Sequence, residues 1–122
     1  MQINRLIFSK LADEIAKLFI SVLIGPRQVG KTFLLRQLDE ECRQRGLTTR
    51  FFNLEDPDDL RAFGGSDEDV IRQLKEMSVD VLFLDEFHYL KNATRMFKVL
   101  YDSGKKMKVF ASGSSSLEIQ NS

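Results

Sequence analysis

Residues 25–32 read Gly-Pro-Arg-Gln-Val-Gly-Lys-Thr and match the phosphate-binding loop pattern Gly-x-x-x-x-Gly-Lys-[Ser/Thr] at every fixed position. The segment follows a short apolar run and precedes a helical pattern, which is the strand–loop–helix context that such a loop needs. Gly25 and Gly30 permit tight turns, so that consecutive backbone N–H groups can point at one phosphate. The pattern therefore predicts an anion cradle built mostly from backbone, at the positive end of a helix dipole.

The loop and the residue after it form the candidate nucleotide-binding segment, namely Gly25, Pro26, Arg27, Gln28, Val29, Gly30, Lys31, Thr32 and Phe33. Lys31 would place its ammonium on the β- and γ-phosphates, and Thr32 would offer its hydroxyl to Mg²⁺. Arg27 lies inside the loop and could contact phosphate, although we expect its side chain to point to solvent. The alternative interpretation is a glycine-rich turn that caps a helix and binds nothing.

Composition limits the classes of protein that fit. A chain of 122 residues with 43% hydrophobic content can bury one core, so we expect a single domain over residues 1–122. The 18 basic and 18 acidic residues cancel, so no long-range field recruits nucleic acid or an anionic membrane. No secretory signal pattern or membrane-length apolar run occurs in the sequence, which favours a cytoplasmic protein.

Helical and strand patterns alternate along the chain, as expected of an α/β fold. We expect a first helix over residues 4–18, with Ile7, Leu11, Ile15 and Leu18 along one stripe, and a nucleotide-binding core over residues 19–116. The expected strands cover 19–24, 48–54, 79–84 and 107–111, with helices between them. The apolar run at 19–24 is rich in β-branched residues, which is typical of a buried parallel strand.

Apolar spacing also predicts the buried helix faces. These faces are Leu34, Leu35, Leu38 and Cys42; Val70, Ile71, Leu74 and Met77; and Met96, Phe97, Leu100 and Tyr101. The predicted helix caps are Asp56, Ser66 and Asn92, and the predicted helix ends are Gly46 and Gly104. Cys42 is interpreted as core filling rather than as a reactive thiol. The cluster of Lys105, Lys106 and Lys108 is interpreted as solvated decoration flanking the last strand.

A second chemical signal lies where the third strand ends. Asp85 and Glu86 follow the apolar residues 81–84, and a carboxylate at the end of a buried strand is costly unless a cation or hydrogen bonds compensate it. Beside the loop at 25–32, the pair fits a Walker B element. Asp85 would hold Mg²⁺ through its water shell, and Glu86 would orient and deprotonate the attacking water. The alternative is a strand that simply ends in polar residues.

A third signal is the run Ser112-Gly113-Ser114-Ser115-Ser116 after the last apolar run. Ligands of parallel α/β sheets gather at the carboxyl ends of the strands. These hydroxyls are therefore expected at the same edge as the phosphate loop.

Together, the loop at 25–32, the strand-borne Asp85-Glu86 and the Ser-Gly-Ser-Ser strand end resemble the AAA-type ATPase domain of many archaeal and bacterial proteins. In that family the domain is usually followed by a C-terminal domain related to restriction-type nucleases. The resemblance implies a P-loop NTPase fold, with three α/β/α layers around a parallel sheet of strand order 5-1-4-3-2. It assigns the role of sensor 1, which reports the γ-phosphate, to Ser112, with Ser114 as the alternate. Asn53 matches only loosely the position that restrains the catalytic glutamate, and an ordinary strand-end asparagine is the other interpretation.

Only ten residues follow Ser112, whereas the crossover to a further parallel strand needs about a dozen or more. We therefore expect a truncated sheet of about four strands in the order 1-4-3-2, with the strand before the loop at an open edge. The helical lid, sensor 2 and the C-terminal domain of the family would be missing partners. An open edge also favours self-association.

The predicted function is Mg-ATP binding and, in the complete protein, hydrolysis by in-line attack of water on the γ-phosphate. Lys31 would neutralise charge and Glu86 would act as base, while this chain alone would turn over little because no arginine finger is identifiable. Two alternatives stay open: an ATP-operated signalling or defence switch that hydrolyses rarely, and a structural fragment that binds no nucleotide. A GTPase is disfavoured because the sequence has no Asn-Lys-x-Asp segment, and a small-molecule kinase would not need Glu86. His88 could line the site, or it could be a partly buried, hydrogen-bonded residue.

Overall fold

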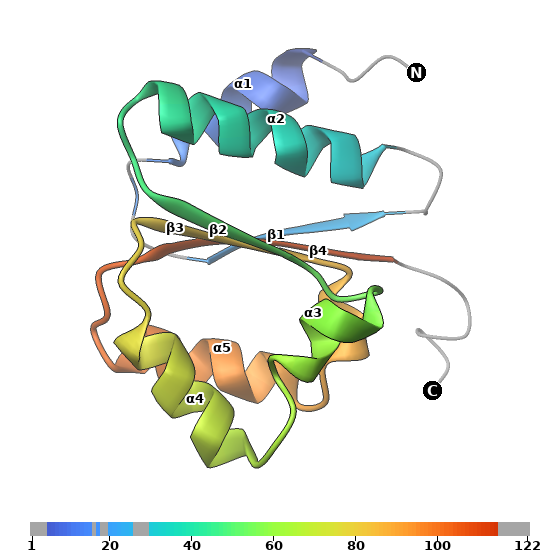
Figure 1. Ribbon diagram of the computed structural model, residues 1–122. Helices are drawn as coiled ribbons and strands as arrows, with labels where there is room; N and C mark the ends of the chain where they lie inside the picture. Colours follow the sequence, from blue (N-terminus) through green and yellow to red (C-terminus); the bar gives the residue numbers. More distant parts are fainter. Residues whose placement is uncertain (1–4, 16, 18–19, 26–29, 115–122) are drawn as a thin grey trace.

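The computed structural model describes residues 5–15, 17, 20–25 and 30–114, and it shows a parallel sheet between two layers of helices (Figure 1). The strands are β1 (Ile20–Gly25), β2 (Thr49–Asn53), β3 (Val81–Asp85) and β4 (Lys108–Ser114). They are hydrogen-bonded in the order β1-β4-β3-β2, and each neighbouring pair is parallel. The predicted α/β class and the predicted strand order 1-4-3-2 are confirmed.

The helices cover both faces of this sheet. On one side lie α1 (Arg5–Asp13) and α2 (Lys31–Gln44), and on the other lie α3 (Pro57–Arg61), α4 (Asp67–Glu76) and α5 (Ala93–Asp102) (Figure 1). A short 3₁₀ turn, η2 (Phe87–Tyr89), follows β3 directly. Because all four strands are parallel, their carboxyl ends lie at one edge of the sheet, where ligands of such folds bind.

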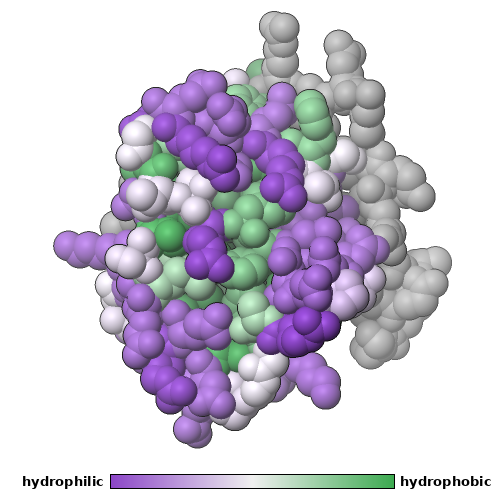
Figure 2. All heavy atoms as spheres, viewed as in Figure 1, coloured by the Kyte–Doolittle hydropathy of each residue, from purple (hydrophilic) through white to green (hydrophobic). Residues whose placement is uncertain are grey.

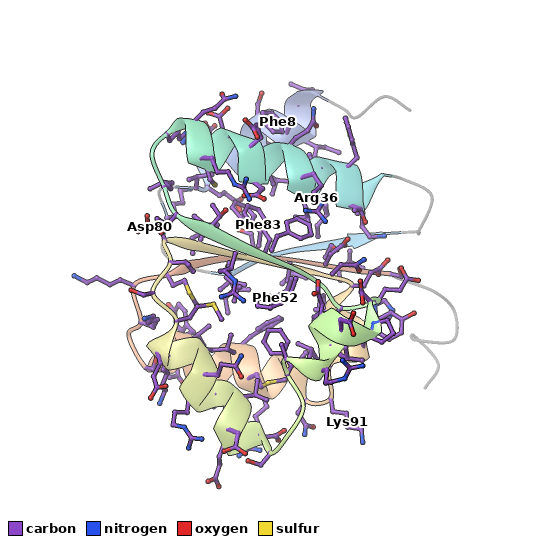
Figure 3. The ribbon with its side chains drawn as sticks, in the orientation of Figure 1. Phe8, Arg36, Phe52, Asp80, Phe83 and Lys91 are labelled. Atoms are coloured by element: carbon purple, nitrogen blue, oxygen red, sulfur yellow. The ribbon has the colours of Figure 1, made fainter. Side chains whose placement is uncertain are left out.

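Each face of the sheet has its own apolar core, because successive side chains of a strand point to opposite faces. Val81 and Phe83 of β3 pack under α2, whereas Leu82 and Leu84 pack against α4 and α5. In Figure 3 the same alternation places Phe83 on the α2 side of the sheet and Phe52 on the opposite side. The face seen in Figure 2 has hydrophobic residues along its middle and hydrophilic residues over the helices.

Local sequence signals explain several helix ends. Asp56 accepts the N–H of Asp58 ahead of Pro57, and Ser66 accepts the N–H of Asp69, so that two of the three predicted side-chain caps are present. Gly46 and Gly104 follow α2 and α5 with positive φ, as predicted. Asn92 precedes α5, but its side chain makes no cap and instead donates to Asp67 at 2.9 Å.

Besides the cap at Asn92, three sequence-based expectations are wrong. Tyr101 is 65% exposed, because the face of α5 that meets the core is formed by Ala93, Met96 and Leu100. Ile7 is also exposed, whereas Ala12, one residue off the expected stripe of α1, is buried. Lys108 is not edge decoration: it is fully buried at the start of β4, which lies between β1 and β3.

Element ends differ from the predicted ranges by a few residues. The first helix ends at Asp13 rather than at residue 18, and β4 begins one residue later and continues to Ser114 rather than stopping at Ala111. Leu18 lies outside the described residues. In the described part of the chain, no helix is long and apolar enough to cross a membrane.

Candidate functional site

The phosphate-loop motif joins β1 to α2 at the carboxyl edge of the sheet. Gly25 ends β1, and Lys31 begins α2 immediately after Gly30, whose backbone is left-handed with φ of 75°. A side chain at this φ would be strained, which accounts for glycine at this position. The candidate residues Pro26, Arg27, Gln28 and Val29 lie outside the described residues.

The three candidate residues in the first turn of α2 differ in exposure. Lys31 is buried, although it carries a long charged side chain, whereas Thr32 and Phe33 are exposed. A helix N-terminus concentrates positive potential and unpaired N–H groups. The first turn of α2, at the end of the helix that favours an anion, therefore carries an exposed hydroxyl residue and a buried lysine.

The two sequence motifs meet at Thr32 and Asp85. The Thr32 hydroxyl donates to Asp85 Oδ2 at 2.6 Å, although 53 residues separate them in the sequence. This contact connects the start of α2 with the end of β3. It brings together an exposed hydroxyl and a carboxylate that is 2% exposed, both of which are oxygen donors.

Ser112 completes the surroundings of Asp85. Its hydroxyl donates to Asp85 Oδ1 at 2.5 Å, so that each carboxylate oxygen of Asp85 receives one hydroxyl. Charge-assisted hydrogen bonds of this kind compensate part of the cost of burying a carboxylate. The fully buried Ser112 hydroxyl therefore stabilises the Asp85 carboxylate by a direct hydrogen bond.

Glu86 is held at two points by the end of β4. Its backbone N–H donates to the Ser112 hydroxyl at 3.1 Å, and its Oε1 accepts the Ser114 hydroxyl at 3.1 Å. His88 Nδ1 lies 3.5 Å from the same Oε1 and 3.5 Å from the backbone nitrogen of Ser114. His88 is half-buried, which agrees with the interpretation of it as a partly buried, hydrogen-bonded residue.

The donors around Asp85 fit the Mg²⁺ that the sequence predicts. Mg²⁺ in nucleotide sites takes oxygen ligands, typically one or two carboxylates together with phosphate oxygens and water. Asp85 and Thr32 supply a carboxylate and a hydroxyl within 2.6 Å of each other. The chemistry of this pair is that of a hard-cation site.

Sequence reasoning missed one contact here. Ser114 was considered only as an alternate γ-phosphate sensor, yet its hydroxyl contacts Glu86. The i, i+2 spacing of Ser112 and Ser114 on a strand was the available signal, because it places both hydroxyls on one face. Asn53 accepts the N–H of Glu55 and so forms a local turn after β2.

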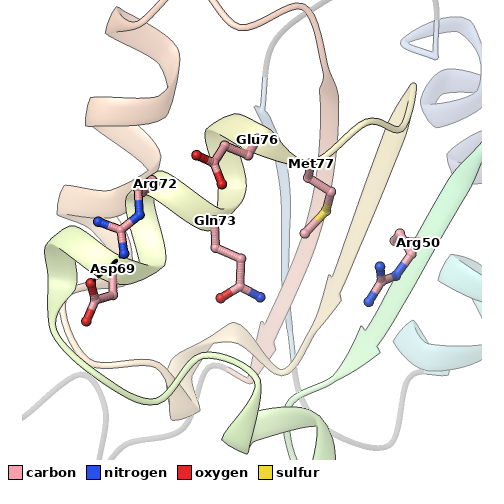
Figure 4. Close-up of a pocket in the computed structure, with 6 residues that line it drawn as sticks. All are labelled: Arg50, Asp69, Arg72, Gln73, Glu76 and Met77. Carbon is pink, nitrogen blue, oxygen red and sulfur yellow. Dashed lines mark hydrogen bonds and ion pairs between the residues drawn. The ribbon is translucent and has the colours of Figure 1, made fainter.

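A separate cavity of about 400 Å³ lies between β2 and α4, on the face of the sheet away from α2 (Figure 4). It is lined by Arg50, Asp69, Arg72, Gln73, Glu76 and Met77. Arg72 pairs with Asp69 at 2.8 Å, and the lining mixes two arginines with two carboxylates. It therefore does not present a single sign of charge to a ligand.

Comparisons with known proteins identify a family for the chain and structures with a similar fold. A sequence model of the AAA domain matches residues 18–122. Comparison with curated proteins finds no match.

Similar folds occur in solved structures of replication initiators. A DNA replication initiation factor has a TM-score of 0.60 and 20% identity over 89% of this chain and 36% of its own. The replication initiator DnaA bound to AMPPCP and single-stranded DNA has a TM-score of 0.62 and 22% identity over 93% of this chain and 39% of its own. AMPPCP-bound DnaA from Aquifex aeolicus has a TM-score of 0.59 and 21% identity, with the same coverage. The chain thus spans less than two fifths of each of these structures.

Proposed function

Since the chain belongs to the AAA domain family, we propose that it binds Mg-ATP at the carboxyl edge of its sheet and that the complete protein hydrolyses the γ-phosphate. The observation that carries this proposal is the 2.6 Å contact between Thr32 and Asp85, which joins the two sequence motifs into one site. Structures of DnaA with AMPPCP support a nucleotide as the ligand of this kind of fold.

The proposed binding roles follow from position. Backbone N–H groups of the phosphate loop and the Lys31 ammonium would neutralise the phosphates, because Gly30 and Lys31 stand at the N-terminus of α2. Thr32 and Asp85 would hold Mg²⁺, which when bound neutralises the charge that develops on the phosphate oxygens. Phe33, which is exposed in the first turn of α2, would line the nucleotide.

Glu86 would act as the general base. A carboxylate next to the metal-binding residue can take a proton from water as the water oxygen bonds to the γ-phosphorus and the bond to the β–γ bridging oxygen breaks. An arginine supplied in trans is worth about 10³- to 10⁵-fold in this reaction class. We therefore propose that full turnover depends on a neighbouring subunit or on parts of a longer protein, such as a lid.

Titration of the chain with Mg-ATP, together with phosphate-release assays, tests this function. Lys31→Ala should weaken nucleotide binding at least about tenfold, whereas Lys106→Ala, which removes an exposed lysine far from the loop, should leave it unchanged. Binding that survives Lys31→Ala would remove the loop as the nucleotide site. An absence of binding by the unmodified chain would favour the structural-fragment alternative.

Glu86→Gln tests the hydrolytic step. It should retain Mg-ATP binding and lower turnover by about 10²- to 10⁴-fold, the range expected on losing a general base. The control is Glu76→Gln, at an exposed carboxylate of α4. Tight binding without measurable turnover by the complete protein would favour the switch alternative, and turnover unchanged by Glu86→Gln would transfer the role of base to another group.

A further inference from the structure

Three consecutive residues at the end of β4 each hold a different part of the turn that follows β3. The hydroxyl of Ser112 accepts the backbone N–H of Glu86 at 3.1 Å, and the hydroxyl of Ser114 donates to the Glu86 carboxylate at 3.1 Å. Because side chains alternate along a strand, Ser112 and Ser114 lie on one face of β4 and Gly113 lies on the other. The turn is thus contacted from both faces of one strand.

Gly113 makes room for the residue after Glu86. A Cβ atom added to Gly113 would lie 2.8 Å from Cε2 of Phe87, closer than real contacts allow. The Phe87 ring also packs against Phe97 of α5, with ring centroids 5.6 Å apart. Close packing of the Phe87 ring against Gly113, which has no side chain, fixes the path of the backbone after Glu86.

The backbone of Glu86 itself is unusual. It has φ of 59° and ψ of 52°, the left-handed region that non-glycine residues rarely adopt. Such a conformation persists when the surroundings over-determine it, and it is frequent at functional sites. Here the surroundings are the two hydroxyls on one face of β4 and the packed ring on the other.

From these contacts we propose that residues 112–114 form a clamp on the Glu86–Phe87 turn, and that Ser114 is a positioning residue that fixes the Glu86 carboxylate for proton abstraction. The inference rests on the proposed function, since it refines the role of Glu86. It differs from the sensor role expected for Ser112 and Ser114, because it assigns their hydroxyls to holding Asp85 and Glu86. Because the hydrogen bond from Ser114 holds Oε1 of Glu86, it also fixes the orientation of Oε2, which would accept the proton of the attacking water.

The clamp would also restrain the catalytic glutamate, which is the role that Asn53 matches only loosely in the sequence. The side chain of Asn53 instead accepts the N–H of Glu55. Ser114 is paired in the sheet with Gly25, the first residue of the phosphate loop. The carboxylate of Glu86 is therefore one hydrogen bond away from the strand position next to the loop. Ser114 thus links Glu86 to the β1–β4 strand pair, at the position where the phosphate loop begins.

Ser114→Ala in the full chain tests the proposal through kcat, the Kd for Mg-ATP and the carboxylate ¹³C resonance of Glu86. We expect kcat to fall about tenfold with Kd unchanged within about twofold, because misplacing a reacting group affects the chemical step. The Glu86 resonance should move even without nucleotide. Ser114→Thr, which keeps the hydroxyl, should restore both, and Ser103→Ala, which removes a hydroxyl that donates to Leu100, should change neither.

A second pair of variants tests the other face of the clamp independently of Ser114. Gly113→Ala should displace the Phe87 ring and lower kcat, and the double variant Gly113→Ala/Phe87→Leu should regain part of the loss because the smaller side chain relieves the contact. Circular dichroism at the assay temperature identifies any variant that has failed to fold, in which case the other pair decides.

The outcomes separate the two proposals. If Glu86→Gln abolishes turnover but Ser114→Ala leaves kcat and the Glu86 resonance unchanged, the clamp is wrong and the proposed function stands. A rise in kcat on Ser114→Ala would also overturn the clamp, since it would show a restraint rather than productive positioning. Turnover that does not depend on Glu86 would overturn both the clamp and the assignment of Glu86 as the base.

Discussion

Lys108 is fully buried at the start of β4, at the opposite end of the strand from Ser114. Its ammonium donates to the Ser21 hydroxyl at 2.5 Å, and it lies 4.0 Å from Glu14 Oε1 and 4.8 Å from the Phe110 ring centroid. Ser21 in turn donates to Glu14. Burial lowers the pKa of Lys108 from its usual 10.5 to about 8, with nearby Glu14 opposing the shift and Lys17 adding to it.

This pKa predicts how stability depends on pH. The unfolded chain keeps the Lys108 proton up to about pH 10.5, whereas the folded chain loses it near pH 8. Because the unfolded state binds more protons in that window, the free energy of unfolding should rise with pH, by up to about 3 kcal/mol from this group. Urea denaturation between pH 7.5 and 10 should show this rise in the unmodified chain relative to Lys108→Met. A parallel pH dependence in the two proteins would contradict the prediction, and Lys106→Met is the control at an exposed lysine.

At the scale of elements, an aromatic ladder joins three strands beneath α2. Phe51, Phe83 and Phe110 are register partners on β2, β3 and β4. Their rings stack with centroids 5.6 Å and 5.4 Å apart. Arg36 of α2 lies 3.8 Å above the outer ring of Phe51 (Figure 3). The ladder ties the middle of the sheet to the helix that begins at the phosphate loop.

Removal of the central ring should therefore be the costliest change in the ladder. Phe83 is fully buried between two rings, and Phe83→Ala should lower the free energy of unfolding by about 3–5 kcal/mol through lost burial and the cavity left behind. Phe51→Ala should cost less, because Phe51 is only half-buried at the edge of the sheet. Chemical denaturation monitored by circular dichroism measures both, and equal losses for the two variants would refute the central role of Phe83.

The sequence predicts the helices and strands from the spacing of their apolar residues, and it predicts the strand order from the resemblance of its motifs to a known family. Leu34, Leu35, Leu38 and Cys42 are all buried as expected, since a long amphipathic helix shows its face clearly. Lys108 was misjudged because its burial depends on Ser21 and Glu14, which lie 87 and 94 residues away. Partners that distant in the sequence leave no local pattern.

Part of the candidate site could likewise be predicted from the sequence, and part could not. The motif spacing identified Thr32, Asp85 and Glu86, and the structure brings Thr32 and Asp85 into direct contact. The pairing of Ser114 with Glu86 could not be read from the sequence, because it requires the left-handed turn at Glu86. Nothing in the identity of a glutamate signals that conformation.

In the molecule as a whole, β1 lies at one edge of the sheet. In the described part of the chain β1 pairs with β4 on one side only. Two side chains of this strand, Val22 and Ile24, are 46% and 52% exposed. An edge strand that combines unpaired backbone groups with exposed β-branched residues is a template for pairing with another chain. We therefore expect this edge to be an association surface.

The expected consequence is concentration-dependent self-association through β1. Light scattering coupled to size-exclusion chromatography should show a mass that increases with loading concentration for the unmodified chain, and Val22→Lys should shift it toward the monomer because edge lysines oppose strand pairing. The matched control is Leu6→Lys, which introduces the same charge at a 71% exposed leucine of α1 and should leave the mass unchanged. A monomer at every concentration would contradict the prediction. Equal effects of the two lysines would show that general charge, rather than the β1 edge, controls association.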